Sequence, residues 1–520
     1  MVAAKRVLRY LKGSIDDMRS TSGYCFTFGS ACFSWCSKKQ EIVAQSTAEA
    51  EFIAATAAVN QALWLKKLMD DLHLEQEEGI EVFVDNQATL AISQNPVFHG
   101  KTKHFKVRYY FLREVQKAGE GFVAGIYLVL FAASSTLLSH GIVAAPPSYN
   151  VINYGAIGNG VSDDTQAFVK AWGNTCGDSG AQGTPTLVVP GGKKFKLSPV
   201  FFKGPCKSSK IFVQIDGTLV APSSLSGWKG CFADSWLVFR DVANLNVKGS
   251  GQVDGQGSLW WGGAKALAFF RCFNLVLSGL QHINSPRNHI SISGCDGGTI
   301  SSLRITAPGT SPNTDGIDIA GTNHLNIHDL NIQTGDDCIA IIGNSSYITI
   351  TGVSCGPGHG ISVGSLGTHG TRDTVEEVHV RNCTFTGSTN GARIKTWQVG
   401  SGYAKSIIFD QITLNAVKNP IIINQFYTNA VAEENAVISR RNYEHASGVV
   451  VSNVTYSGFQ GTSATDQAIT LSCSSAGCSD IILDNIKITS STPGRTVTAS
   501  CMNAHGSATL TTPPVPCLLR

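Results

Sequence analysis

The chain has 520 residues, of which 42% are apolar and 15% charged, and its formal net charge is +3 at pH 7. This length suits two to four domains, or one elongated repeat fold with an appendage. The apolar content and the absence of a Gly-x-y period exclude a disordered chain and a collagen. A net charge so close to zero gives no electrostatic reason to expect binding to nucleic acid.

Composition changes abruptly near residue 120. Residues 1–120 contain 29 charged residues and six glycines, whereas residues 121–520 contain 48 of each. Charged residues therefore become half as frequent, and glycines more than twice as frequent. This shift, together with an apolar run at the junction, predicts three parts: a first segment over 1–120, an apolar segment over 121–145 and a main domain over 146–520.

The first segment mixes helical and strand patterns. Residues 46–72 begin with Ser-x-x-Glu and continue with apolar residues at helical spacing, and residues 80–87 read as a strand. The strings STSGYCFTFGSACFSWCSKKQ, STAEAEFIAA, FVDNQATLAIS and NPVFHGKTKHF resemble the ribonuclease H segment of copia-type retrotransposon polyproteins. The resemblance covers nearly all of residues 1–119 and implies an α/β fold.

That resemblance also implies four carboxylates that hold two Mg²⁺ ions. Glu51 and Asp85 take two of these positions, but the strand of the first carboxylate is missing and the apolar segment replaces the last. Two carboxylates cannot hold two ions that each want six oxygen ligands. We therefore expect an incomplete ribonuclease-H-like fragment, with Glu51 and Asp85 as degenerate remnants and without nuclease activity.

The apolar segment has the make-up of a secretory signal peptide. GFVAGIYLVLFAASSTLL (121–138) follows Lys117 and precedes the small-residue cleavage pattern Val143-x-Ala145. A membrane span is the alternative, because 18 apolar residues just reach the lower limit for one. We expect a cleaved signal, a secreted protein and no stable membrane association. The unusual internal position of this signal indicates that the first 120 residues are an accidental fusion or an assembly error.

The main domain contains short runs rich in Ile, Val, Thr, Asn and Gly, broken by turns. Only DDTQAFVKAWGNTC (163–176) has a clear helical pattern. Similarity at a spacing of 20–30 residues predicts a β-solenoid. The alternative, an antiparallel sandwich, would show hairpin signals between adjacent strands.

Polar residues reveal the period of this solenoid. Asp315, Asp337 and His359 follow one another at intervals of 22 residues, in TDG, DDC and GHG. In a solenoid with that period they stack on neighbouring coils, ~4.8 Å apart. Charge repulsion makes such stacking costly, which favours a functional cleft over a structural ladder. Asp336 adds another carboxylate to the group.

Clustered carboxylates separate one another's pKa values, so that one stays protonated while another is ionised. Cleavage of a glycosidic bond requires such a pair. Two coils after His359, Arg393 and Lys395 share one face of a strand by their i, i+2 spacing. A cationic pair beside acids suits a sugar that carries a carboxylate. Surface salt bridging is the alternative interpretation of these cations.

These residues belong to a set of motifs that resembles the polygalacturonases, glycoside hydrolase family 28. The motifs occur in the family's order: NTDG (313–316), GDD (335–337), GHG (358–360), RIK (393–395), with NYGAIGNGVSDDTQAF (153–168) before them and NPIIINQFY (419–427) after them. The resemblance covers about residues 150–520. It implies a right-handed single-stranded parallel β-helix that hydrolyses the α-1,4 bonds of pectin and polygalacturonate with inversion, without a metal or other cofactor.

The resemblance also implies roles for single residues. Asp336 is the general acid, Asp315 and Asp337 activate water, and His359 steadies the acid. The implied substrate-binding residues are Asn313, Arg393, Lys395 and Tyr427. A carboxylate separation near 5 Å is typical of retaining enzymes, whereas this family inverts. We follow the family, because two carboxylates can share one water.

Residues 146–520 contain twelve cysteines, which predicts up to six disulfides in a secreted protein. The resemblance implies a bridge between Cys338 and Cys355, and further plausible pairs are Cys473–Cys478 and Cys501–Cys517. Glycosylation sequons occur at Asn344, Asn382 and Asn453. We expect a monomer with no nucleic-acid partner, located outside the cell or in the cell wall.

One segment departs from the family. The charged residues 428–446 follow Tyr427 where similar proteins continue with a cysteine-containing loop. Because this segment borders the expected cleft, an inactive chimeric product is one alternative. The others are a rhamnogalacturonan or xylogalacturonan hydrolase, a Ca²⁺-dependent pectate lyase and a wall-binding protein without activity.

Overall fold

The computed structural model describes residues 146–224, 228, 234–427 and 448–519, together with the backbone of five strands among the first 145 residues. The chain divides into two compact units, Met1–His140 and Gly141–Arg520. Glu51, the apolar segment 121–145 and the segment 428–446 lie outside the described residues, as does Asp85. None of the helices in the described part is both long and apolar enough to cross a membrane.

The first unit contains a small sheet. Its strands are β1 (Val2–Ala4), β2 (Val7–Leu11), β3 (Thr21–Phe28), β4 (Ala31–Lys39) and β5 (Glu81–Val82). β3 pairs antiparallel with β1, β2 and β4, and β1 pairs parallel with β5. β5 falls within the strand expected at residues 80–87. The ribonuclease-H-like fold of this segment stays a prediction.

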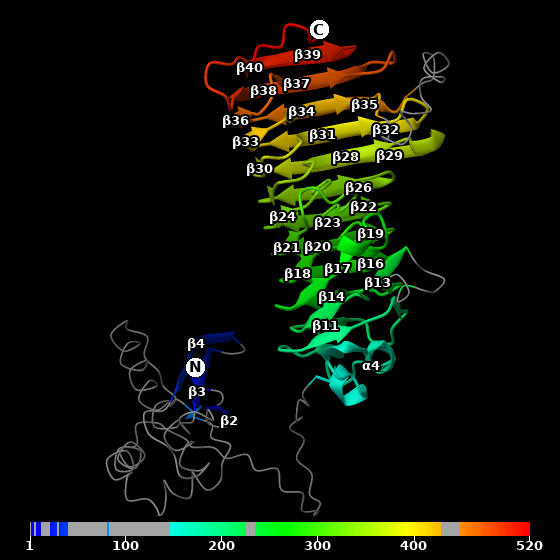
Figure 1. The fold of residues 1–520 in the computed structure, drawn as a ribbon, viewed down its shortest axis with the longest axis vertical. Helices are drawn as coiled ribbons and strands as arrows, with labels where there is room; N and C mark the ends of the chain where they lie inside the picture. Colours follow the sequence, from blue (N-terminus) through cyan, green and yellow to red (C-terminus); the bar gives the residue numbers. More distant parts are fainter. Residues whose placement is uncertain are drawn as a thin grey trace, which may run out of the picture. The chain divides into compact units, whose positions relative to one another are not determined.

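The second unit is a parallel β-helix, in which successive coils stack from α4 (Thr165–Gly177) to the C-terminus (Figure 1). The expected solenoid is therefore confirmed, and so is the helix expected at residues 163–176. Short 3₁₀ turns complete the described elements: η3 (Val151–Tyr154), η5 (Gly257–Leu259) and η6 (Thr368–Gly370).

One face of the solenoid is a sheet of eleven strands. They are, in order, β10 (Val200–Lys203), β13 (Ser235–Arg240), β16 (Lys265–Phe270), β19 (Ile290–Ser293), β22 (Ile317–Ala320), β25 (Ile339–Ile341), β28 (Ile361–Leu366), β31 (Asn390–Thr396), β34 (Asn419–Asn424), β37 (Gln467–Ser472) and β39 (Thr498–Met502).

The remaining strands of this unit form a path of 24 that bends around the other faces. They are β6 (Ser148–Asn150), β7 (Asn159–Asp163), β8 (Thr186–Val189), β9 (Lys194–Lys196), β11 (Ile211–Ile215), β12 (Thr218–Val220), β14 (Leu245–Lys248), β15 (Gln252–Asp254), β17 (Phe273–Ser278), β18 (Gln281–Ile283), β20 (Asp296–Ser301), β21 (Arg304–Thr306), β23 (Asn323–His328), β24 (Asn331–Gln333), β26 (Ser345–Thr351), β27 (Ser354–Cys355), β29 (Arg372–Arg381), β30 (Thr384–Thr386), β32 (Ser401–Asp410), β33 (Thr413–Val417), β35 (Val450–Ser457), β36 (Gln460–Ser463), β38 (Cys478–Ser490) and β40 (Ala504–Thr512).

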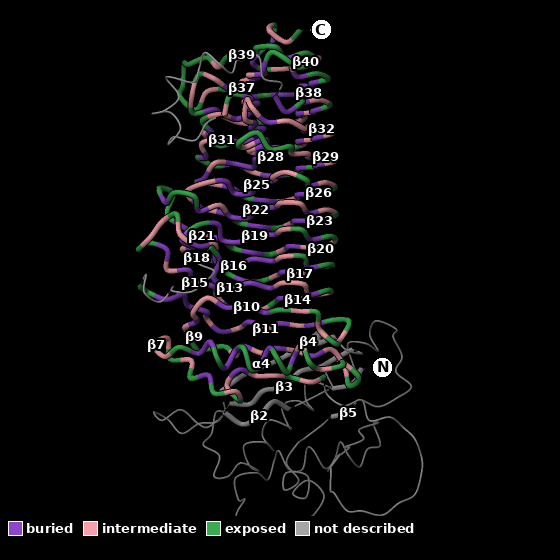
Figure 2. The backbone as a smooth tube through the Cα atoms, turned by 90° about the vertical axis from the view of Figure 1, so that its right-hand side faces the viewer, coloured by how far each residue is buried: buried purple, intermediate pink, exposed green. Residues whose placement is uncertain are grey.

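Alternation of side chains explains why these sequences coil. Along each strand successive side chains point to opposite faces, so every second residue enters the interior. Ile292, Ile319, Ile341, Val363 and Ile394 pair in register on five successive strands, and all five are fully buried. Buried residues accordingly run through the stacked coils in Figure 2. Branched aliphatic side chains suit this pleated, packed environment.

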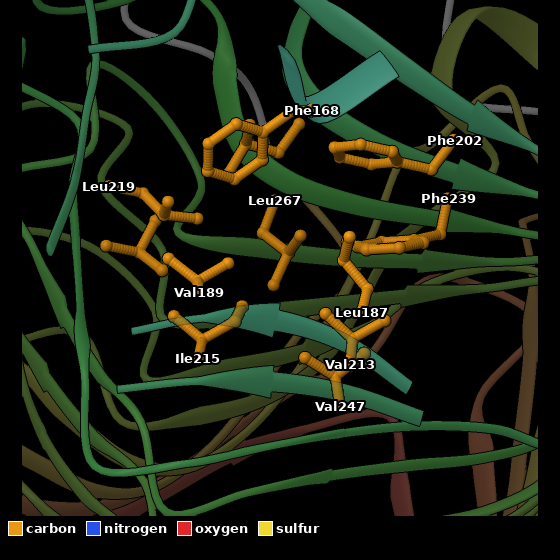
Figure 3. A pocket seen from close by; sticks show the side chains of 12 residues that line it. Phe168, Leu187, Val189, Phe202, Val213, Ile215, Leu219, Phe239, Val247 and Leu267 are labelled. Carbon is orange, nitrogen blue, oxygen red and sulfur yellow. The ribbon is translucent and has the colours of Figure 1, made fainter. Parts of the chain in front are cut away.

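The first coils contain a small apolar cavity. Phe168 of α4 lines it together with residues of the first coils, including Phe202, Phe239 and Leu267 (Figure 3). All twelve of its lining side chains are apolar. Since the cavity lies in the core and offers no polar group, it is a packing feature and not a sugar-binding site.

The disulfides fall short of the expected maximum. Among the described residues four occur, Cys176–Cys206, Cys338–Cys355, Cys473–Cys478 and Cys501–Cys517, and Cys231 lies outside those residues. The three pairings anticipated above are among them. Cys272, Cys295 and Cys383 are free and buried, so an even cysteine count did not translate into six bridges. Buried cysteine packs as a small apolar residue, which accounts for these three positions.

Truncating one rung of the interior column should destabilise the domain measurably. We expect Ile341→Ala to lower the free energy of unfolding by about 2–5 kcal/mol, because it removes apolar surface and leaves a cavity between rigid coils. Chemical denaturation measures the change. Ile482→Ala, at a side chain that is 41% exposed in the same solenoid, is the matched control and should cost much less. Equal losses in the two variants would contradict this account of the core.

Candidate active site

Three turns that enter successive strands of the eleven-stranded sheet bring the predicted acids together. Asp315, Asp337 and His359 each lie two residues before a strand, β22, β25 and β28 respectively. These strands pair in register at an offset of 22 residues. The backbone continues the ladder through the turns, with Gly316 N–H donating to the Asp337 carbonyl at 2.9 Å. The stacking expected from the 22-residue interval is confirmed.

Buried hydroxyls hold two of these turns in place. Thr314 Oγ1 accepts a hydrogen bond from Gly335 N–H at 3.0 Å and lies 2.7 Å from Ser311 Oγ. Gly335 itself must be glycine, because a Cβ there would stand 2.0 Å from the Ser311 carbonyl oxygen. The residues that flank the acids in NTDG and GDD therefore fix where the acids point.

Asp337 is the buried centre of the site. Its side chain is 1% exposed and forms ion pairs with Arg393 and with Lys395 Nζ, the latter at 2.8 Å. Ser362 Oγ donates to it at 2.9 Å and accepts from Arg393 Nε at 2.8 Å. Burial would raise the pKa of Asp337, but the two cations and these hydrogen bonds hold it below its usual value. Asp337 is therefore an anion near neutral pH.

The sequence interpretation placed these cations two coils beyond His359, and this is wrong. β31 pairs directly with β28, with Arg393 opposite Ser362, so the cations lie on the next coil. The extra residues of that interval are used by η6 and by the ten-residue strand β29, which lengthen the coil without adding another. The shared face of Arg393 and Lys395 is as expected, because both reach Asp337.

Asp336 and His359 form a pair that solvent can reach. His359 Nδ1 lies 2.9 Å from Asp336 Oδ1, and the side chains are 35% and 23% exposed. His359 N–H also donates to the Asp336 carbonyl at 2.8 Å, which ties one turn to the next. One ligand atom each of Asp336, Asp337 and His359 lie within 4.8 Å of one another. The exposed pair thus sits directly beside the buried anion.

Asp315 is electrostatically different from Asp337. Burial and the charges of Asp318, Asp336 and Asp337 raise its pKa well above the ordinary value. No ion pair is recorded for its carboxylate in the described residues. Two neighbouring carboxyls therefore differ strongly in acidity, as chemistry with one acid and one base requires.

Asp318 was not among the predicted residues. It accepts a hydrogen bond from Asn288 Nδ2, its Oδ1 is buried without a partner, and burial with the Asp337 charge raises its pKa to about 7. A signal was present: in TDGIDIA it is a charged residue on the outward side of an otherwise apolar strand. Sequence reasoning selected acids by the 22-residue interval and by the NTDG and GDD motifs, and Asp318 lies outside both.

The remaining predicted residues lie around this cluster. Lys395 Nζ stands 5.0 Å from the centre of the Tyr427 ring, and Trp397 packs edge-on against that ring. Asn313 is exposed, lies two residues before Asp315 and has a left-handed backbone with φ of +56°. Among the described residues, no side-chain hydrogen bond joins Asn313 to the predicted catalytic residues or to Arg393, Lys395 or Tyr427.

Asp336, Asp337 and His359 are also the described group that could offer ligands to a metal ion. Both oxygens of Asp337 already accept from cationic side chains, and His359 Nδ1 already faces Asp336. A divalent cation would meet Arg393 and Lys395 at close range, so these residues fit a metal poorly.

Comparison with known proteins points to one family. The model of the family "Glycosyl hydrolases family 28" matches residues 176–511. A probable polygalacturonase of Arabidopsis thaliana is 48% identical over 384 residues, which are 72% of this chain and 82% of the relative. A polygalacturonase of Malus domestica is 41% identical over 360 residues, 66% of this chain and 75% of the relative.

Solved structures show the same fold at lower identity. The endo-xylogalacturonan hydrolase of Aspergillus tubingensis has a TM-score of 0.58 at 23% identity, covering 70% of this chain and 100% of its own. The polygalacturonase of Erwinia carotovora has a TM-score of 0.54 at 23% identity, covering 72% of this chain and 100% of its own. These likenesses confirm the pectinase-type parallel β-helix.

Asp318, whose Oδ1 is buried, should make stability depend on pH. Its pKa of about 7 lies above the ~3.9 of an unfolded aspartate, so its contribution to stability is intact below pH ~4 and is lost as pH rises toward 7. We expect Asp318→Asn to become increasingly more stable than wild type over that range, by about 1.4 kcal/mol per pH unit at most. Denaturation at several pH values measures this difference. Asp466→Asn, at a side chain that is 65% exposed, is the control; a flat difference for Asp318→Asn would contradict the assignment.

Proposed function

Because the chain belongs to the glycosyl hydrolases of family 28, we propose that it is a polygalacturonase that hydrolyses the α-1,4-galacturonosidic bonds of pectin and polygalacturonate with inversion. Relatives named polygalacturonases match at 48% and 41% identity over most of their length, which supports this substrate. The observation that carries the proposal is the exposed Asp336–His359 pair beside an aspartate that two cations keep ionised.

Asp336 acts as the general acid in this proposal. Its side chain is 23% exposed, and its carboxyl has a partner for proton exchange in His359 Nδ1 at 2.9 Å. The acid protonates the leaving glycosidic oxygen as the bond breaks, and His359 can then return a proton to it. The buried anion Asp337 beside the pair offsets the positive charge that develops on the sugar ring.

Asp315 and Asp337 together activate the attacking water. Asp315 is the better proton acceptor of the two, since its raised pKa brings it closer to a working pH, whereas Asp337 is held by its cations. Asp337 orients the water and keeps the local charge balanced. Two carboxyls on neighbouring coils can share one water, which reconciles their close stacking with inversion.

Arg393 and Lys395 bind the galacturonate carboxylate with the donors that Asp337 leaves free. A lysine ammonium has three donors and a guanidinium five, so pairing with Asp337 does not exhaust either group. Tyr427, whose ring lies under Lys395 Nζ, forms the wall of the sugar subsite, and the exposed Asn313 contacts the sugar from the turn before Asp315.

We further propose that the protein is a secreted cell-wall enzyme, acts as a monomer, needs no cofactor and has no nucleic-acid partner. The sequons at Asn344, Asn382 and Asn453 support the secretory route, because all three asparagines are exposed, two of them between strands and Asn453 within β35. We also propose that the enzyme is the domain over 146–520, with the signal-like segment 121–145 and the truncated retroelement segment 1–120 before it.

Removing the proposed acid tests the mechanism. We expect Asp336→Asn to lower the release of reducing sugar from polygalacturonate at least ~100-fold, because general acid catalysis contributes about 10²–10⁴. Activity should survive a chelator and yield no unsaturated product, unlike that of a Ca²⁺-dependent lyase.

The matched control is Asp329→Asn. Asp329 forms the same kind of pair with His328, at 2.8 Å, but it is 71% exposed and lies on another face of the solenoid. This variant should retain wild-type activity. Full activity of Asp336→Asn would exclude the proposed acid, and a wild type that releases no sugar would indicate an inactive protein.

A further inference from the structure

The outer face of the eleven-stranded sheet carries two columns of side chains that extend well beyond the site. The column that contains Arg393 runs back, in register, through Ser362, Ala340, Asp318, Ser291, Ala268, Val238 and Phe201. The neighbouring column, two residues further along each strand, contains Ala320, Ser293, Phe270, Arg240 and Lys203. Lys395 follows Arg393 by two residues, as Lys203 follows Phe201. Arg393 and Lys395 therefore lie on the same face of the sheet as Lys203 and Arg240.

The far end of these columns holds a second cationic cluster. The Arg240 guanidinium lies 5.8 Å from the Phe201 ring centre and 5.1 Å from that of Phe270, and Lys203 Nζ lies 5.7 Å from Phe201. The two rings lie on β10 and β16, the strands on either side of β13, and together they fix the orientation of the planar Arg240 cation. No described residue accepts a hydrogen bond from this guanidinium, so its donors lack a partner within the described structure.

These two cations have no acidic partner among the described residues. The nearest carboxylate in the sequence is that of Asp241. It accepts hydrogen bonds from Nε and Nη2 of Arg271, at 2.7 and 2.8 Å. Arg240 Nε is buried and has no hydrogen-bond acceptor. Buried donors are normally satisfied, so this one leaves the guanidinium with capacity for an acceptor beyond the described residues. A guanidinium with a neighbouring ammonium suits a carboxylate.

The spacing suits a long polyanion. β13, which carries Arg240, lies four strand spacings from β25, at whose start Asp336 and Asp337 stand. At ~4.8 Å for each spacing the separation is ~19 Å along the solenoid axis, and Lys203 is one strand further away. Between Arg240 and the site the column contains Phe270, whose ring contacts the guanidinium, and then Ser293 and Ala320, which are small and partly exposed.

We propose that Lys203 and Arg240 form a distal binding site for a galacturonate carboxylate of the same polymer whose bond lies at Asp336. The inference rests on the proposed polygalacturonase activity. It predicts that long chains gain affinity from contacts that a short oligomer cannot reach, while the chemistry at Asp336 stays the same.

The test compares polygalacturonate with trigalacturonate as substrates for the double variant Lys203→Met/Arg240→Gln. We expect the ratio of kcat/KM for the polymer to that for the trimer to fall about tenfold, through KM, which corresponds to ~1.4 kcal/mol of lost binding. The single variant Lys203→Met, at an exposed side chain, should give part of this loss without disturbing the packing of the two rings.

The matched control is Lys210→Met/Lys248→Met. These lysines flank Phe212 at 5.0 and 4.9 Å, but they belong to the other sheet path. Its polymer-to-trimer ratio should equal that of wild type. An unchanged ratio in Lys203→Met/Arg240→Gln, or the same fall in the control, would overturn the distal site.

Calorimetric binding keeps this test separate from that of the proposed activity. If wild type cleaves neither substrate, the proposed hydrolysis fails, yet the affinities for polymer and trimer can still be compared. Weaker binding of the polymer alone by the double variant supports the distal site, and equal affinity of wild type and variant for the polymer rejects it.

Discussion

Parallel pairing of successive coils is the constraint on which the site depends. Once β22, β25 and β28 pair at an offset of 22 residues, their preceding turns must stack, whatever their charge. The interior isoleucines contribute the burial that maintains this register, because a one-residue slip would turn every inward side chain outward. The packed core thereby holds the carboxyls of Asp315 and Asp337 close together against their mutual repulsion and stacks His359 on the next coil.

The same forced proximity determines the acidity of each group. Asp337 tolerates complete burial because Arg393 and Lys395 come from the next coil and pair with it. A buried charge without such partners would cost several kcal/mol. Asp315 forms no ion pair with a cation in the described site. Burial and the negative charges of the neighbouring acids therefore raise its pKa. The stacked turns thus hold an ionised carboxylate, Asp337, next to Asp315, a carboxyl of higher pKa that can accept a proton. The difference arises because Arg393 and Lys395 pair with Asp337 alone.

Much of this arrangement was predictable from residue spacing. The interval between Asp315, Asp337 and His359 predicted the stacked turns, and the alternation in RIK predicted a shared face. What spacing could not supply was coil length, which varies with turns such as η6, so Arg393 was placed one coil too far. It also missed Asp318, Ser362 and Thr314, whose importance comes from burial and hydrogen bonding and not from periodicity.

The departure from the family at residues 428–446 can be judged by the same constraint. β34 ends at Asn424 before it and β35 begins at Val450 after it, and the ladders continue on both sheet paths: Ile421 opposite Ile469, and Tyr403 opposite Val450. The cost of closing a longer connection grows only slowly with its length, whereas a register shift would displace every side chain. Because the register is kept on both sides of this segment, the strand that carries Arg393 and Lys395 keeps its pairing with β34.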